Sequence, residues 1–159
     1  MQLLISDANV IIDMEDGGLT RQMFALPYQF LVPDLLFYDE LEQHHPELLE
    51  LGLGLVELAP ESMERAFQLE QEYRRPSVND CFALAAAEQE KCPLITCDGP
   101  LRKAAQKEKI QILGTLWVVE ELVTYGLITK EQARSAFKAM KENGSRLPWS
   151  EVDKLLNRL

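Results

Sequence analysis

Hydrophobic residues along the chain occur mostly in short runs bounded by polar or turn-forming residues. The first run, Leu3-Leu4-Ile5, has the length of a strand, and Gln29 to Val32 forms a second run that ends at Pro33. Runs of about four to eight such residues are typical of buried strands. The same reasoning predicts three further strands, at residues 55–58, 93–96 and 110–114.

Between the strands, apolar residues recur at helical spacing. Pro33 marks the start of a helix that runs through His44, and Pro60 marks the start of a long amphipathic helix. Ser77 and Asp80 have the spacing of a capping box before a helix of small apolar residues. Further helices are predicted at residues 19–25, 101–108, 115–125, 129–143 and 150–159.

This alternation of strands and helices predicts an α/β fold with three layers, α/β/α, around a mostly parallel sheet of about four to five strands. The 159 residues fit one domain, 1–159, with a core of about 1–128 and a helical C-terminal extension of about 129–159. Residues 13–18 interrupt the alternation. Their acids and the Gly17-Gly18 pair predict a solvated turn.

The composition is ordinary for a soluble globular protein, with 47% hydrophobic and 26% charged residues. No apolar run approaches the roughly 18 residues that a membrane-spanning helix needs. No basic segment precedes the first apolar run, so we expect no signal peptide. Cys81, Cys92 and Cys97 fit neither a disulfide framework nor a zinc site. These features predict a cytoplasmic protein with reduced thiols and no membrane contact.

The net charge of −10 argues against a broad nucleic-acid-binding surface, because attraction to phosphate is the main contribution to such binding. The charge does not exclude a nuclease, since cations held by carboxylates attract phosphate locally. A few basic residues are candidates for binding RNA, although a single basic residue is more often only a solvated surface charge. These candidates are Arg74, Arg75, Arg102, Lys103 and Lys107.

Four acids stand at the ends of predicted strands or near the starts of the helices that follow. Asp7 and Asp98 end two strands. Glu40 lies about two turns into a helix, and Asp80 lies in the first turn of another. Each acid also has a simpler explanation. Asp7, Asp80 and Asp98 are suited to capping a turn or helix, and most acids on a helix, such as Glu40, are solvated.

All four acids can converge, because the carboxyl ends of parallel strands meet at one edge of a sheet. Carboxylates gathered in one place repel one another unless they are protonated or neutralised by cations. Mg²⁺ and Mn²⁺ prefer carboxylate and water ligands, and such a centre activates phosphodiesters and water. The adjacent His44 and His45 do not suit one ion, since neighbouring residues on a helix point about 100° apart.

At these acids the sequence resembles the PIN-domain family, of the kind found in VapC-type toxin ribonucleases. The resemblance covers residues 1–115. Residues 114–117 and 125–128 are similar to an uncharacterised prokaryotic subgroup of PIN-like proteins. The matching segments are Ser6 to Ile12, Val32-Pro33 followed by Glu40-Leu41, Asn79-Asp80-Cys81 and Leu94 to Asp98. Their order and spacing are more specific than any one of them.

The resemblance implies a PIN-like fold and a metal-dependent endoribonuclease that uses Mg²⁺ or Mn²⁺. The implied catalytic and metal-binding residues are Asp7, Glu40, Asp80 and Asp98, with Ser6, Asn9 and Thr96 as polar supports. RNA products with 5′-phosphate and 3′-hydroxyl ends are implied as well. The resemblance also implies a homodimer. For the toxin of a type II toxin–antitoxin pair, it implies a cognate antitoxin peptide.

Two other functions stay open at this point. One is a phosphoryl-transfer or phosphatase-like domain, which also places acids at strand ends. It usually has an Asp-x-Asp motif and a Lys directly after a strand, whereas this chain has Asp7-Ala8-Asn9 and no such Lys. The other is a PIN-fold interaction module without catalysis. The presence of all four acids weighs against that function.

Overall fold

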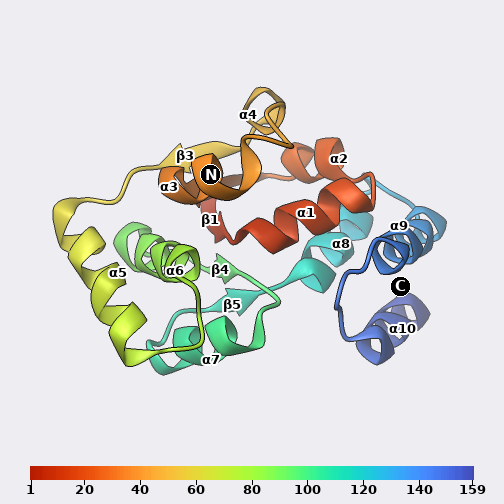
Figure 1. The fold of residues 1–159 in the computed structure, drawn as a ribbon. Helices are drawn as coiled ribbons and strands as arrows, with labels where there is room; N and C mark the ends of the chain where they lie inside the picture. Colours follow the sequence, from red (N-terminus) through yellow and green to blue (C-terminus); the bar gives the residue numbers. More distant parts are fainter.

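Five parallel strands form the central sheet in the order β3-β2-β1-β4-β5 (Figure 1). In the computed structural model, which describes residues 1–159, Leu4 pairs with Phe30, and Ile5 pairs with Leu94. The sheet is therefore parallel throughout, which confirms the predicted strand number and direction. The strands are β1 (Gln2–Ser6), β2 (Tyr28–Pro33), β3 (Gly54–Val56), β4 (Leu94–Ile95) and β5 (Ile112–Leu113).

Helices cover both faces of this sheet, which confirms the three-layer α/β/α prediction. Figure 1 shows α1, α2 and α8 on one side of the strands and α5, α6 and α7 on the other. None of the helices has the length and apolar character needed to cross a membrane. The helices are α1 (Ala8–Asp16), α2 (Thr20–Ala25), α3 (Asp34–Leu36), η1 (Phe37–Leu41), α4 (Leu48–Leu51), α5 (Pro60–Glu72), α6 (Val78–Glu90), α7 (Gly99–Lys107), α8 (Thr115–Thr124), α9 (Lys130–Glu142) and α10 (Trp149–Arg158).

Helix α1 occupies a segment for which the sequence predicts a solvated turn. Asp7 caps its N-terminus, since the Asp7 side chain accepts a hydrogen bond from Val10 N at 3.0 Å. Val10, Ile11 and Met14 are fully buried and lie at the spacing of one helix face. The turn predicted at residues 13–18 is therefore wrong for Asp13, Glu15 and Asp16, which lie in α1. Only the Gly17-Gly18 pair forms the turn.

Glu40 lies in a short π-helix, η1, that continues directly from α3. Within it, Glu42 N donates to Phe37 O at 2.9 Å. The helix predicted through His44 is therefore shorter than expected and ends at Leu41. A π-helical turn is wider than an α-helical turn, and such turns often occur at functional sites.

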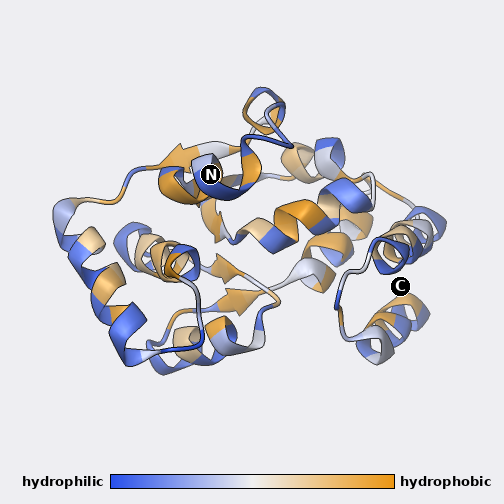
Figure 2. Cartoon of the chain, in the orientation of Figure 1, coloured by the Kyte–Doolittle hydropathy of each residue, from blue (hydrophilic) through white to orange (hydrophobic).

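Helix α6 consists largely of small residues and is buried, as its sequence predicts. Its buried residues include Ala83 and Ala85 through Ala87, so its backbone lies close to β1, β2 and β4. Figure 2 shows that the strands are predominantly hydrophobic, whereas hydrophilic residues gather on the outer helices. The three cysteines are free; Cys81 and Cys92 are buried and Cys97 is half-buried.

The C-terminal helices α9 and α10 belong to the same hydrophobic core as the sheet. Ala136 and Met140 of α9 are buried. A Cβ atom placed on Gly17 would lie 2.7 Å from Met140 Cε, so α9 packs tightly against the end of α1. This packing fixes the path of the segment that joins α9 to α10.

Candidate functional site

The carboxyl edge of the sheet brings Asp7 and Asp98 together. Strand order reverses direction between β1 and β4, and ligands of open α/β sheets bind at such switch points. Asp7 follows β1 directly, and Asp98 follows β4 by way of Thr96 and Cys97. Thr96 Oγ1 donates to Asp7 Oδ2 at 2.5 Å and accepts from Asp98 N at 3.0 Å. Thr96 therefore links the two acids.

Three of the acids also cap helices, so the simpler explanation considered above is correct for them as well. Asp7 Oδ1 caps α1, and Asp98 Oδ2 accepts from Leu101 N at 2.9 Å to cap α7. Asp80 Oδ2 accepts from Ser77 N at 3.0 Å in the capping box of α6. Each cap uses one carboxylate oxygen. Capping and site formation are therefore compatible.

Glu40 joins the same edge through Asn79, which the sequence placed in the segment Asn79-Asp80-Cys81 but not among the site residues. The buried Asn79 amide donates to Glu40 Oε2 at 3.0 Å and to Asp39 Oδ2 at 2.8 Å. Asn79 thereby connects η1 to the first turn of α6, directly before Asp80. The only sequence signal for this contact is the position of Asn79 next to a candidate acid. The Glu40 residue as a whole is exposed.

Electrostatic interactions connect the four acids. Burial raises the pKa of Asp7 to about 7; hydrogen bonds from Thr96 and Val10 oppose this increase, and the charge of Asp80 adds to it. Burial also raises the pKa of Glu40 and of Asp80. Asp80 contributes to the raised pKa of Glu40, and Asp98 contributes to that of Asp80. The ionised acids therefore repel one another.

The donor set fits a divalent cation such as Mg²⁺ or Mn²⁺. None of the four acids forms an ion pair with a Lys, Arg or His side chain. Glu40 Oε1, Asp80 Oδ1 and Asp98 Oδ1 accept no hydrogen bond within the chain. Carboxylate oxygens without partners, in a cluster of like charge, are the ligands that these ions prefer. Mg²⁺ keeps several water ligands, so an open arrangement of acids suits it.

The side chains whose ligand atoms lie closest together are away from this edge, and the four acids are spaced more widely than these. Glu15, His45 and Glu47 place one ligand atom each within 4.8 Å of one another. His45 Nδ1 lies 3.5 Å from Glu15 Oε2, and Thr20 Oγ1 donates to Glu15 Oε1 at 3.0 Å. Glu15 is near the far end of α1, about 12 Å along the helix from its N-terminus. His44 is not in this group. This agrees with the expectation that the adjacent His44 and His45 side chains point in different directions.

Asp13 is part of a buried polar contact that the sequence analysis missed. The side chain is 8% exposed and accepts hydrogen bonds from Thr115 Oγ1 at 2.8 Å and from Ser145 Oγ at 2.9 Å. Burial raises the pKa of Asp13. No local pattern could have indicated these two partners, because both come from the last third of the chain.

A cavity of 540 Å³ lies beside Asp98, and its lining includes Asn9, Asp13, Asp16 and Arg146. Asn9 is exposed at this cavity. In contrast, the buried Ser6 hydroxyl donates to Asp7 O at 2.8 Å and so supports the backbone rather than a carboxylate.

Four of the basic residues singled out in the sequence line a neighbouring hollow of 630 Å³, namely Arg74, Arg75, Lys103 and Lys107. We call this surface the basic hollow. Gly99 lines both the basic hollow and the cavity beside Asp98, so the two adjoin. Arg102 lies elsewhere. Its Nη1 donates to the backbone carbonyl of Thr96 at 2.5 Å.

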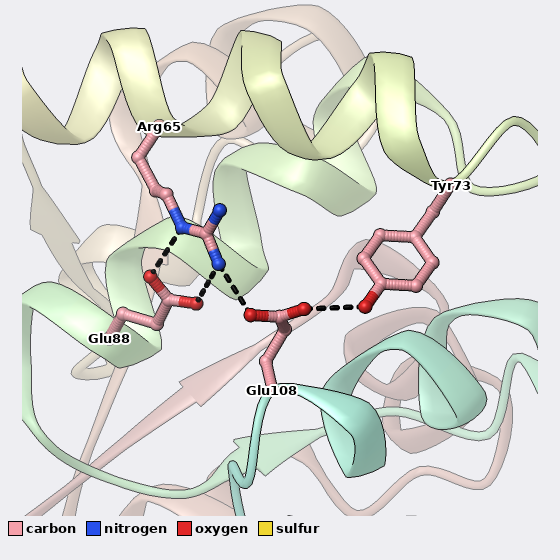
Figure 3. Close-up of polar contacts among 4 residues, drawn as sticks. All are labelled: Arg65, Tyr73, Glu88 and Glu108. Carbon is pink, nitrogen blue, oxygen red and sulfur yellow. Dashed lines mark hydrogen bonds and ion pairs between the residues drawn. The ribbon is translucent and has the colours of Figure 1, made fainter.

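A polar network holds together the helices that form the basic hollow (Figure 3). Arg65 of α5 pairs with Glu88 of α6, its Nε lying 3.0 Å from Glu88 Oε2, and also with Glu108 after α7. The Tyr73 hydroxyl donates to Glu108, which raises the pKa of Tyr73 to about 12. This network fixes the end of α5, where Arg74 and Arg75 follow, relative to α7.

Comparison with known proteins shows the family of the chain. None of the curated proteins compared with the chain matches it. The model of a protein family described as a PIN domain matches residues 3–159, which is nearly the whole chain. PIN domains are generally nucleases and usually bind divalent metals. The chain belongs to the PIN-domain family.

Proposed function

We propose that this protein is an endoribonuclease that depends on Mg²⁺ or Mn²⁺. One observation carries the proposal: Asp7, Glu40, Asp80 and Asp98 come from four separate segments to one sheet edge, and no cation of the chain neutralises them. An assembly of unpaired carboxylates is costly unless a bound cation offsets their repulsion. Membership of the PIN-domain family supports the same function.

Each acid has a distinct part in this proposal. Asp7, held by Thr96 and by the first turn of α1, is the fixed ligand at the centre. Asp98 and Asp80 approach it from the starts of α7 and α6, each with one oxygen free. Glu40 is oriented by Asn79 and offers its Oε1 atom.

When bound, the cation would supply electrophilic activation of the phosphodiester and make water a stronger nucleophile at neutral pH. The basic hollow would bind the RNA backbone, because its four cations line a hollow that adjoins the cavity beside Asp98. Arg102 is also a candidate contact of the RNA. Its guanidinium is tied to backbone carbonyls, so we expect a smaller effect from its substitution than from that of Lys103.

The proposal is tested by incubating the purified protein with RNA in Mn²⁺ or Mg²⁺, in EDTA, and as the Asp7→Asn variant. Cleavage should require the metal and should fall by several orders of magnitude in the variant. Cleavage that survives both EDTA and the substitution would contradict the metal site. Release of phosphate from a small phosphomonoester without RNA cleavage would favour the phosphatase-like function.

A toxin role is the finer part of the proposal, with an antitoxin peptide and a second copy of the chain as partners. Family resemblance in the sequence supports it, and the acidity of the protein suits a basic partner peptide. Induced expression should arrest bacterial growth for the native chain but not for Asp7→Asn. Unimpaired growth with the native chain at matched protein levels would remove the toxin role and leave the nuclease proposal standing.

A further inference from the structure

The segment between α9 and α10 forms one wall of the cavity beside Asp98. Asn143 through Leu147 line this cavity opposite residues of α1 and the start of α7. Ser145 Oγ donates to Asp13 Oδ1, and the same carboxylate receives the Thr115 hydroxyl through Oδ2. Leu147 is buried. The segment is therefore held on both sides of Arg146.

Arg146 carries the only basic side chain in the lining of that cavity. The residue is exposed, and its guanidinium forms no hydrogen bond or ion pair within the chain. Its neighbours in the cavity lining include the acids Asp13, Asp16 and Asp98. A cation kept beside acids without pairing with any of them remains available to an external anion.

Cations consequently line two adjoining hollows that meet at Gly99, directly after Asp98. The basic hollow adjoins the cavity at Gly99, whereas Arg146 belongs to the wall formed by the C-terminal segment. A polyanionic chain that passes Asp98 from one hollow to the other would meet both the basic hollow and Arg146. A guanidinium binds phosphate oxygens with two parallel hydrogen bonds, which a single ammonium group cannot do.

We propose that Arg146 binds a phosphate of the RNA substrate next to the bond that is cut. The C-terminal segment thereby completes the substrate site instead of only covering the core. This inference rests on the proposed ribonuclease function, which it deepens. It assigns a substrate-binding residue to the last part of the chain.

The test measures binding separately from cleavage. The Asp7→Asn variant serves as the background, in Mg²⁺, with a fluorescently labelled single-stranded RNA of 12 nucleotides, about the span of one small domain. Fluorescence anisotropy at several salt concentrations gives the dissociation constant and its salt dependence for three additional substitutions, Arg146→Gln, Arg146→Lys and Arg134→Gln. Arg134 is an exposed arginine of α9 that does not line the cavity, and it serves as the matched control.

Arg146→Gln should weaken binding roughly tenfold, as expected for loss of a hydrogen bond to a charged group. The slope of log affinity against log salt should become shallower by about 0.7, the value for one phosphate contact on a single strand. Arg146→Lys should keep the native slope but bind more weakly. Arg134→Gln should change neither quantity.

Equal binding by the Arg146→Gln and Arg134→Gln proteins would overturn the inference, and so would the absence of RNA binding by the background protein. A separate cleavage assay with native Asp7 distinguishes this failure from that of the proposed function. If Arg146→Gln weakens RNA binding but the native protein does not cleave RNA, the phosphate contact is upheld and the proposed nuclease function is contradicted.

Discussion

Asp7 illustrates, at the scale of a single residue, how a structural role and a site role coincide. Ser, Thr or Asn would cap α1 as well as Asp does. A buried carboxylate at this position costs more, because burial disfavours its ionised form and raises the pKa to about 7. Capping alone therefore does not explain the choice of Asp at this position, whereas the proposed cation site would explain it.

Replacing Asp7 with Asn should have opposite effects with and without metal. In EDTA at pH 8, the variant should unfold at a higher temperature than the native protein, because the amide keeps an acceptor for Val10 N and removes a buried charge. In Mg²⁺, the native protein should gain stability and the variant should not. Differential scanning calorimetry measures both. A similar Mg²⁺ stabilisation of the two proteins would contradict the role of Asp7.

Asn79 is a positioning residue whose effect should be seen in catalysis and in metal affinity. Asn79→Ala removes the hydrogen bond to Glu40 Oε2. Loss of such an outer-shell contact typically costs about 10- to 100-fold in activity or metal affinity. Cleavage kinetics and Mn²⁺ titration calorimetry measure the two quantities. Asp39→Ala, which removes the other acceptor of the Asn79 amide, is the control and should have a smaller effect.

At the scale of elements, the small residues of α6 determine how closely the start of this helix approaches the sheet edge. Ala83 is fully buried. Ala83→Leu should lower the free energy of unfolding by about 1–3 kcal/mol or more, because a packed core resists added volume. Urea denaturation measures the change. Gln71→Leu at an exposed position of α5 is the control, and an equal effect in both variants would contradict the packing argument.

Elements with strong local signals could be predicted from the sequence. The five strands and the helix starts at Pro60, Ser77 and Thr129 follow from apolar runs and caps. Helix α1 was missed because Val10-Ile11-Ile12 follows a strand and has no polar residue to reveal its period. The π-helical turn at Glu40 was missed because its wider turn depends on surrounding packing rather than on local composition.

The candidate site could be predicted in part for the same reason. Strand ends and helix starts place Asp7, Asp80 and Asp98 at one edge once the sheet is parallel. The amide of Asn79 and the hydroxyl of Ser145 could not be assigned, because their partners lie 39 and 132 residues away in sequence. Contacts at such separations depend on the packing of whole layers.

At the scale of the whole molecule, stability without metal should fall as pH rises. The pKa of Asp7 increases from 3.8 to about 7 on folding, and Asp13, Glu40 and Asp80 shift in the same direction. A carboxyl group with a raised pKa binds more protons when folded, so its contribution is full below about pH 4 and is lost by about pH 7.

Chemical denaturation in EDTA between pH 5 and pH 8 measures this dependence. Saturating Mg²⁺ should flatten the decline, because the cation favours the ionised acids. The Asp7→Asn protein should show a shallower decline in EDTA than the native chain. A native protein that becomes more stable from pH 5 to pH 8 in EDTA would contradict the electrostatic description of the sheet edge.

The wide separation of contacting residues also affects when the protein becomes competent during its synthesis. Thr96 meets Asp7 across 89 residues, and Ser145 meets Asp13 across 132. A nascent chain on the ribosome therefore lacks the link between Asp7 and Asp98 until β4 has emerged, and it lacks the wall that carries Arg146 until residues 143–147 have emerged. For the proposed ribonuclease, this order means that the complete site assembles only after both of these segments have been made.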